Sequence, residues 1–368
     1  MRLLSLDVQD FRNIARARLE PSARATVLVG ENGQGKTNLL EAVYFACTLK
    51  PLRAARLAEV VRFGAERASV AADVEAAGGT RRVRVDVAPG GRTAFLDGKP
   101  QDRFDDYFDG LLAVCFSPDD LSIVKGGPEV RRRFLDRATF NRWPAFLAEA
   151  RDYVRALRAR NAALRSAEPE VELSFRTPLV RAGARVVRRR RELLAEVAPR
   201  VAAAYREISG GAGPEARVGY RAAGGISIEG TEDELVTRLA ELLAMRVRRD
   251  RDRGYTSAGP HMDDLALALD AHGARPFASQ GQQRALVLAL KIAEIENLRA
   301  ALGRPPLLLL DDVSSELDPH KNRFLLEYLR HLPGQVFLTT TDRHLVELAT
   351  DQEAALYEVT SGTFTRVI

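Results

Sequence analysis

The sequence predicts an α/β fold that is interrupted by a mostly helical insertion. A glycine-rich turn, Gly30–Thr37, stands between a short apolar stretch and a helical stretch near the start of the chain. A second apolar stretch, Leu307–Leu310, leads into Asp311, which comes 274 positions after Thr37. Consecutive elements of one domain are usually adjacent, so an inserted domain is the simplest explanation of this distance.

The distribution of charge indicates where the insertion lies. The chain has 368 residues, enough for two or three domains. Residues 113–255 carry 28 basic and 20 acidic side chains, a net charge of +8, whereas the rest carries 27 and 30, a net charge of −3. We therefore expect a discontinuous α/β domain over residues 1–112 and 256–368, and a basic, mostly helical arm domain over residues 113–255.

The first part of the chain is typical of strands arranged around one helix. Alternating or continuous apolar runs predict the strands, and the longer stretch at 36–48 predicts the helix. Residues 81–87 and 93–96 alternate as in a hairpin, and Asp97-Gly98 is a turn signal. The expected strands are residues 2–8, 13–20, 26–29, 81–87, 93–96 and 111–116.

The pattern becomes helical after Pro118 and stays so over residues 128–209. Prolines are expected to start or end helices in this stretch. They are Pro144, Pro169, Pro178 and Pro199. A few short strands and a helix near 231–250 follow. From residue 265 onward strands and helices alternate again, with strands at 265–269, 307–310 and 336–341 and helices that begin near 281 and 319.

The glycine-rich turn fits the phosphate-loop pattern G-x-x-x-x-G-K-[ST] without a mismatch. Glycines let backbone N–H groups turn inward around phosphates, and the helix that follows adds the positive end of its dipole. The lysine of the pattern reaches the β- and γ-phosphates, and its hydroxyl residue ligates Mg²⁺. The candidate nucleotide-binding residues are Gly30, Glu31, Asn32, Gly33, Gln34, Gly35, Lys36 and Thr37.

Two carboxylates follow the apolar strand at 307–310. A strand that is apolar throughout is typical of the interior of a parallel sheet, and ligands bind at the carboxyl ends of such strands. We therefore expect Asp311 to hold Mg²⁺ together with Thr37, and Asp312 to orient the attacking water. The alternative is that both carboxylates only cap the next turn.

A second helix start completes the pattern of motifs. Ser279 is a natural N-cap for the helix that begins near 281. Taken alone, Ser279-Gln280-Gly281-Gln282 is a capped amphipathic helix. The order along the chain is more informative. The phosphate loop comes first, then the long insertion, the Ser-x-Gly-Gln helix, the strand that ends at Asp311 (the acidic strand), and Ser315–Asp318. That order is the layout of an ABC-type ATPase.

Other stretches make the similarity specific. On its motifs and on these stretches the chain resembles the RecF family of bacterial DNA replication and repair proteins, ABC-type ATPases related to the heads of Rad50 and SMC proteins. The resemblance covers essentially the whole chain. The matching stretches are Leu6–Asn13, Phe116–Leu121, Gly126–Asp136, Asn161–Arg165 and Tyr255–Leu265.

The resemblance implies a role for each motif. ATP and Mg²⁺ would be the cofactors, with Thr37 and Asp311 at the metal. Ser279–Gln283 would be the signature motif, which in this family contacts the γ-phosphate on the opposite subunit, and Ser315–Asp318 would be the D-loop. The implied catalytic residues are Lys36, Asp312 and Ser279, and the implied nucleotide contacts outside the phosphate loop are Arg12, Gln280, Gly281 and Gln282.

The sequence departs from the family pattern of many ABC ATPases in three places. Asp312 stands where many relatives have a glutamate, so slow hydrolysis is expected. The signature motif has Gln280 where transporters have glycine. The strand at 336–341 ends in threonines where many ABC ATPases carry a switch histidine, and His344 lies close by.

The function that the resemblance implies is a weak, DNA-stimulated ATPase. ATP binding would drive formation of a homodimer on single-strand/double-strand DNA, and slow hydrolysis would reset it. Such a protein would support DNA replication, recombinational gap repair and SOS induction, with RecR and RecO as partners. Basic clusters suit phosphate backbones, although each is equally well explained as a solvated helix face. The candidate DNA contacts are Arg131, Arg132, Arg133, Arg188, Arg189 and Arg190.

Three other functions share parts of this pattern. The ATPase subunit of a membrane transporter would have the same ATP site but no basic helical domain in the insertion. A monomeric P-loop kinase would have no use for the Ser279 helix. A binding module that never hydrolyses ATP would use Asp311 and Asp312 only for Mg²⁺.

Composition excludes several classes. No apolar run approaches the ~20 residues of a membrane span, and the first residues meet charge too early for a signal peptide. Cys47 and Cys115 stand alone, which argues against a disulfide scaffold and favours the cytoplasm. His261 and its neighbouring aspartates include possible metal ligands, but a structural cluster of hydrogen bonds is the favoured interpretation.

Overall fold

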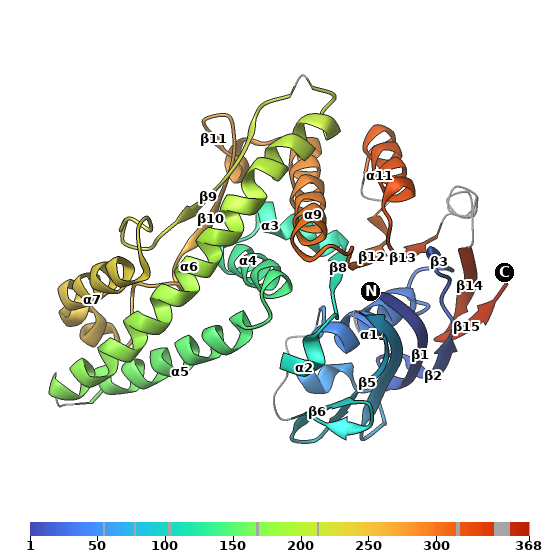
Figure 1. Ribbon diagram of the computed structural model, residues 1–368, viewed down its shortest axis with the longest axis horizontal. Coiled ribbons are helices and arrows are strands. Elements are labelled where there is room, and N and C mark those ends of the chain that lie inside the picture. Colours follow the sequence, from blue (N-terminus) through green and yellow to red (C-terminus); the bar gives the residue numbers. More distant parts are fainter. Residues whose placement is uncertain are drawn as a thin grey trace. The chain divides into compact units, whose positions relative to one another are not determined.

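The computed structural model describes residues 1–53, 56–76, 79–101, 105–166, 169–211, 213–313, 317–341 and 354–367. The chain forms two compact units (Figure 1). The α/β unit comprises residues 1–120 and 298–368, and the helical unit comprises residues 121–297.

The units divide at different places from the domains expected from the sequence, whose limits were 112/113 and 255/256. The strand β8 (Ala113–Phe116) pairs in parallel with β12 (Leu307–Asp311), which ties it to the α/β unit. The strand β10 (Asp264–Leu269) pairs with β9 (Ala216–Arg221), which ties it to the helical unit. Charge and local pattern do not encode these long-range pairings, so the limits expected from the sequence differ from those in the structure.

The central sheet of the α/β unit orders its strands β15-β14-β3-β13-β12-β8. All neighbours from β14 to β8 are parallel, and β15 is antiparallel to β14. Every residue of β8, β12 and β13 is buried, as expected for strands with both faces covered. The other bounds are β3 (Ala25–Val29), β13 (Val336–Thr340), β14 (Ala354–Thr360) and β15 (Thr363–Arg366).

An antiparallel sheet, ordered β2-β1-β4-β5-β6-β7, forms the second layer of this unit. Its strands are β1 (Arg2–Phe11), β2 (Ile14–Leu19), β4 (Ala68–Ala76), β5 (Gly79–Ala88), β6 (Gly91–Leu96) and β7 (Lys99–Pro100). The helix α1 (Lys36–Thr48) contacts strands of both sheets and is buried along most of its length. The other described helices of this unit are η1 (Leu57–Val60), α2 (Asp105–Phe108), η2 (Pro118–Leu121) and α11 (Pro319–His331).

The helical unit is built around α6 (Pro169–Ile208), which packs against α5 (Phe146–Leu164) and α7 (Glu232–Arg253), as Figure 1 shows. Its apolar core includes Phe146, Leu179 and Leu239. The short sheet β11-β10-β9 completes it. The remaining elements are α3 (Ser122–Lys125), α4 (Pro128–Arg142), β11 (His272–Gly273), α8 (Ala274–Phe277) and α9 (Gln280–Leu302), the last of which belongs to this unit up to Asn297.

The expected strands and helices occur with ends that differ by a few residues, but the sequence did not predict the strands β4, β7, β11, β14 and β15. The expectation that Pro178 and Pro199 end helices is wrong, because both lie inside α6. A proline removes one backbone hydrogen bond, and packing of neighbours such as Leu179 and Val197 keeps the helix continuous across the two sites. None of the helices in the described ranges is long and apolar enough to cross a membrane.

Candidate nucleotide-binding site

The phosphate loop connects the end of β3 to the start of α1, as the sequence predicted. Gly33 and Gly35 have φ values of 79° and 114°, which favour glycine. A Cβ atom on Gly35 would lie 2.8 Å from Asn13 Oδ1, and one on Gly30 would lie 2.4 Å from the carbonyl oxygen of Val359. The glycines therefore permit both the turn and the close packing of its two ends.

The loop is anchored to the turn between β14 and β15. The carbonyl oxygen of Gln34 accepts hydrogen bonds from the backbone N–H of Gly362 at 2.8 Å and from Asn13 Nδ2 at 3.3 Å. Gln34 Oε1 accepts from the backbone N–H of Ser361 at 2.6 Å. The side chain of Gln34 thus has a structural role, and Asn13 is a supporting residue that the motif alone did not identify.

Lys36 is buried at the first position of α1. Its Nζ atom donates to the carbonyl oxygens of Gly30 at 2.6 Å and Glu31 at 2.8 Å. Burial lowers the pKa of Lys36, while the carboxylates of Asp312, Asp311 and Glu31 act in the opposite direction. The ammonium group thus donates to carbonyl oxygens of its own loop. The oxygens of a phosphate group would be stronger acceptors than these carbonyls.

The structure brings Thr37 and Asp311 together, as expected for a metal site. Thr37 Oγ1 donates to Asp311 Oδ1 at 2.6 Å, and Thr339 Oγ1 donates to the same oxygen at 3.0 Å. Mg²⁺ is commonly bound by one or two protein oxygens together with phosphates and water, and a hydroxyl next to a carboxylate fits that requirement. Asp311 is 2% exposed, so the pair is held in a fixed position.

Asp312 continues from the strand in a left-handed backbone conformation with φ 48°. Its backbone N–H donates to Thr339 Oγ1 at 2.9 Å, which links it to the hydrogen bonds of Asp311. A positive φ in a residue other than glycine is uncommon and is enriched at functional sites. The catalytic role of Asp312 stays a prediction.

Arg53 is a site residue that the sequence did not predict. Its Nη2 atom donates to Asp311 Oδ2 at 2.6 Å, and its Nε atom lies 3.5 Å from Asp119 Oδ2. The chain contains 55 basic residues, and no motif distinguishes Arg53 from the others. Only the fold, which returns the segment after α1 to the end of β12, reveals this contact.

Arg12 was expected to contact the nucleotide. In the structure its guanidinium donates to both carboxylate oxygens of Glu41, at 2.9 and 3.0 Å, and to the carbonyl oxygen of Glu59 at 2.8 Å. Like Asp312, it has a positive φ, 56°. Its described contacts are with α1 and η1, so its contact with a nucleotide stays a prediction.

Ser279 caps α9, as the sequence predicted. Its Oγ atom accepts from the backbone N–H of Gln282 at 3.2 Å, and Gln282 Oε1 accepts from the backbone N–H of Ser279 at 2.8 Å. Ser279 and Gln280 are exposed, whereas Gly281 and Gln282 are half-buried. This motif belongs to the helical unit and the phosphate loop to the α/β unit. Ser315, Glu316 and His344 lie outside the described residues.

The prediction that Arg131 and Arg190 contact DNA is wrong, because both side chains are buried in ion pairs. Arg131 is 7% exposed and binds both oxygens of Asp264, at 2.7 and 2.9 Å. Arg190 is 4% exposed and donates to Asp136 at 2.8 Å and to the carbonyl oxygen of Pro260 at 2.8 Å. Both guanidinium groups are enclosed within the helical unit, where a DNA backbone has no access to them.

The other four candidates differ in availability. Arg188 pairs with Glu192 and Glu232, and Arg189 with Glu149 and Glu192. Arg132 is half-buried and donates to the carbonyl oxygen of Asp263 at 2.7 Å. Arg133 is exposed.

The favoured interpretation of His261 is confirmed. Its Nδ1 atom lies 2.5 Å from Tyr153 Oη and its Nε2 atom 2.9 Å from the carbonyl oxygen of Thr256, so both ring nitrogens have partners. Burial lowers the pKa of His261, which keeps the ring neutral at neutral pH. Within the described ranges no group of three or more His, Cys, Asp or Glu residues is placed to hold a metal.

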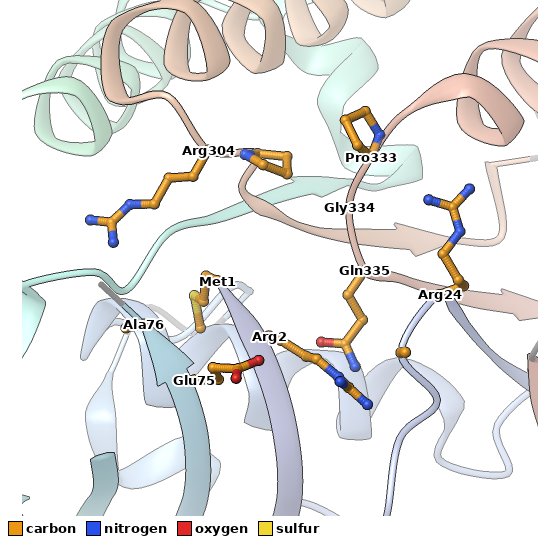
Figure 2. A pocket seen from close by; sticks show the side chains of 11 residues that line it. Met1, Arg2, Arg24, Glu75, Ala76, Arg304, Pro333, Gly334 and Gln335 are labelled. Atoms are coloured by element: carbon orange, nitrogen blue, oxygen red, sulfur yellow. The ribbon is translucent and has the colours of Figure 1, made fainter. Parts of the chain in front are cut away.

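A pocket of about 450 Å³ lies at the amino ends of the central strands, opposite the ends that lead into the phosphate loop and Asp312 (Figure 2). Arg24, Pro305 and Gln335, which precede β3, β12 and β13, form part of its wall. Figure 2 shows Arg2, Arg24 and Arg304 pointing apart rather than toward one point. Since the phosphate loop follows the carboxyl end of β3, this pocket is separate from the nucleotide-binding residues.

The phosphate loop, the acidic strand that reaches it and the capped helix in the second unit together define an ABC-type ATPase head. A family model described as "RecF/RecN/SMC N terminal domain" matches residues 2–365. The chain belongs to the RecF family. It is 72% identical over 368 residues to the "DNA replication and repair protein RecF" of Anaeromyxobacter sp. (strain Fw109-5), with all of both chains covered.

Solved structures agree with this assignment. The structure titled "Structure of the recombination mediator protein RecF-ATP in RecFOR pathway" is 27% identical with a TM-score of 0.90, and the match covers 100% of this chain and 97% of that one. An SMC head bound to the C-winged helix domain of ScpA is 15% identical with a TM-score of 0.55, over 100% of this chain and 97% of that one. The second similarity concerns the fold alone.

Proposed function

We propose that this chain is an ATP-gated DNA-binding switch that mediates recombinational DNA repair and supports replication and the SOS response. The observation that carries the proposal is the 2.6 Å hydrogen bond from Thr37 to Asp311, which joins the phosphate loop to the acidic strand across 274 positions. Family membership supplies the biological setting, since the relatives are named as DNA replication and repair proteins and a structural neighbour as a recombination mediator with ATP.

The residues of the α/β unit would bind and hydrolyse ATP in defined roles. The ammonium group of Lys36 would exchange its bonds to the loop carbonyls for bonds to the β- and γ-phosphates. Thr37 and Asp311 would hold Mg²⁺, which when bound offsets the negative charge of those phosphates. Asp312 would accept a hydrogen bond from the attacking water. Its side chain is one methylene shorter than that of glutamate, so we expect slow turnover.

The signature motif, Ser279–Gln283 at the start of α9, would complete the site across a homodimer. Ser279 presents a hydroxyl and the N-terminus of α9 to solvent, an arrangement suited to a phosphate oxygen. ATP can drive dimerisation only if it binds the dimer more tightly than the monomer. The added contacts of Ser279, Gln280 and Gly281 from the opposite subunit would provide that difference in affinity.

The helical unit would supply the DNA-binding surface. Residues 121–297 carry 31 basic and 23 acidic side chains, a net charge of +8. The exposed arginines on which we base this proposal are Arg133, Arg248, Arg249 and Arg253, the last three on α7. Contacts of this kind make affinity depend strongly on salt. RecR and RecO are the proposed partners, on the basis of family membership.

The test is the mass of the Asp312→Asn variant in solution. Light scattering with Mg²⁺ and either ATP or ADP measures whether the chain dimerises, and the substitution prevents hydrolysis during the measurement. We expect a shift from monomer to dimer with ATP alone. Binding of a fluorescent ATP analogue is measured in the same samples.

A constant monomer in samples that bind ATP would overturn the proposed switch. It would remove the role given to Ser279 and would favour a monomeric P-loop enzyme. Dimerisation that is equal with ATP and ADP would also contradict the proposal, because the γ-phosphate would then make no difference between the two states.

A further inference from the structure

We propose that Arg53 is a built-in counter-ion of Asp311 that a divalent metal must displace when nucleotide binds. Arg53 would thereby lower the affinity of the site for metal. The inference rests on the proposed function, because it assumes that Asp311 is the carboxylate at the metal. It adds a residue to that site that no motif in the sequence identifies.

The carboxylate of Asp311 has hydrogen-bond donors on both oxygens. Oδ1 accepts from Thr37 at 2.6 Å and from Thr339 at 3.0 Å, and Oδ2 accepts from Arg53 Nη2 at 2.6 Å. The contact with Arg53 is a charge-assisted hydrogen bond, the stronger kind. A divalent ion at either oxygen competes with the guanidinium for the negative charge of this carboxylate, and an ion that binds Oδ2 also needs lone pairs that accept from Arg53.

Arg53 also supplies the positive charge that a buried carboxylate needs. Asp311 is 2% exposed, and an ionised group in such a place is costly unless it is paired. The nearby cation Lys36 directs its described hydrogen bonds to the carbonyl oxygens of Gly30 and Glu31. In the described part of the chain, the cation that forms a hydrogen bond with Asp311 is therefore the guanidinium of Arg53.

The position of Arg53 is determined by a buried carboxylate on α1. Glu41 is 1% exposed, and its Oε1 atom accepts from the backbone N–H groups of Leu52 at 3.0 Å and Arg53 at 3.1 Å. Glu41 lies four residues after Thr37 and so on the same side of the helix. Arg12 neutralises it with two further hydrogen bonds. The segment that carries Arg53 is thus tied to the helix that carries the metal ligand Thr37.

A second carboxylate allows Arg53 to leave Asp311 without losing its charge partner. Arg53 Nε lies 3.5 Å from Asp119 Oδ2. Asp119 is 74% exposed in its side chain and can follow the guanidinium. The metal would therefore take the place of Arg53 at Asp311, while Arg53 would keep its ion pair with Asp119.

The experiment measures metal affinity directly. Mn²⁺ binding is followed by electron paramagnetic resonance, in the presence of a saturating non-hydrolysable ATP analogue with a β,γ-imido bridge. The variants are Arg53→Ala and Arg53→Gln, which both remove the charge, and Arg53→Lys, which keeps it. Arg56→Ala is the matched control, because Arg56 is an exposed arginine three positions further along.

We expect Arg53→Ala and Arg53→Gln to bind Mn²⁺ on the order of tenfold more tightly than the unaltered chain, as loss of a competing charge-assisted hydrogen bond implies. The Mn²⁺ affinity of Arg53→Lys, which keeps the charge, should lie between that of these two variants and that of the unaltered chain. Arg56→Ala should match the unaltered chain. If Arg53→Ala does not fold, Arg53→Gln, which can still donate a hydrogen bond, decides the question. Equal or weaker Mn²⁺ binding without the arginine would overturn the inference.

A separate measurement distinguishes this inference from the proposed function. Binding of the analogue is measured with Mn²⁺ for the unaltered chain and for Lys36→Ala. If neither binds, the proposed ATP site fails, and the inference about Arg53 with it. If only the unaltered chain binds and Arg53→Gln leaves the Mn²⁺ affinity unchanged, the ATP site stands and the role of Arg53 alone is refuted.

Discussion

Arg131 Nε lies 2.7 Å from Asp264 Oδ1, and both side chains are at most 8% exposed. Arg160 is fully buried in the same unit, with Glu172 at 2.7 Å and Asp250 at 2.9 Å. In the helical unit a basic residue can therefore serve as an internal cation that neutralises a buried carboxylate. The number of arginines in a cluster says little about DNA until the burial of each one is known.

The Arg131 pair gives a prediction about stability. Removing Arg131 leaves the buried Asp264 with Arg221, whose side chain is 70% exposed, as its remaining ion-pair partner. We therefore expect Arg131→Met to lower the free energy of unfolding by about 3 kcal/mol, the lower end of the range for a broken buried pair. The exposed control Arg133→Met should change it by less than about 0.5 kcal/mol. Trp143, the single tryptophan of the chain, lies in the helical unit, so its fluorescence during urea unfolding reports on that unit.

The same pair predicts how the effect depends on pH. Burial raises the pKa of Asp264, but hydrogen bonds and charge from Arg131 and Arg221 outweigh it, and the net result is a pKa below the usual range. A depressed pKa stabilises the fold above the unfolded value of about 3.9, and this stabilisation is lost as the pH falls through the folded value. The difference between the unaltered chain and Arg131→Met should therefore be largest near neutral pH and should shrink below pH ~4. A difference that grows in acid would contradict this account.

At the scale of single elements, α6 shows how packing overrides a local signal. Pro178 and Pro199 were expected to end helices, yet the helix runs from Pro169 to Ile208 without a break. Its apolar side chains pack against α5 and α7, and packing of this kind provides most of the stability of a helix in a folded protein.

This account predicts that the prolines reduce the stability of α6. Pro199 is exposed, so Pro199→Ala should raise the free energy of unfolding by about 1–3 kcal/mol, since proline is about 3 kcal/mol less favourable than alanine inside a helix. Ala195→Pro, at an exposed position one turn earlier, should lower it by a similar amount. Both are measured by urea unfolding with Trp143 fluorescence. A destabilised Pro199→Ala variant would show that the proline is instead needed where it stands.

The elements also show how much the sequence could predict. The phosphate loop, α1, the acidic strand and the cap of α9 follow from short local patterns, and the structure contains all of them. Arg53 and the ion pair of Arg131 depend on contacts between residues 258 and 133 positions apart. No local pattern specifies such a partner. Among so many arginines, the sequence therefore did not identify Arg53 as a site residue and wrongly suggested Arg131 and Arg190 as DNA contacts.

At the scale of the whole molecule, the proposed switch depends on residues that lie in different compact units. Lys36 belongs to the α/β unit and Ser279 to the helical unit. In the proposed dimer each ATP would contact Lys36 of one subunit and Ser279 of the other. A substitution in one motif would then alter both ATP sites of a homodimer. In a heterodimer of two variants that are altered in different motifs, one of the two ATP sites would be unaltered.

That arrangement predicts complementation between two inactive variants. Lys36→Ala should lose ATP binding, whereas Ser279→Arg should keep ATP binding to the monomer but block dimerisation, because its bulk and charge occupy the exposed start of α9. When the two are mixed, one site of the heterodimer combines Lys36 from one subunit with Ser279 from the other, and both are unaltered. Light scattering with Mg²⁺ and ATP should therefore detect dimers in the mixture and monomers in each variant alone.

The mixture distinguishes the two possible positions of Ser279. If Ser279 acted on the ATP of its own subunit, every site in the mixture would contain one altered residue, and no dimer would form. If Ser279→Arg abolished ATP binding by the monomer, the serine would likewise belong to the monomer's own site. Dimers in the mixture would require that the two residues act on one nucleotide from opposite subunits, since no other pairing restores an unaltered site.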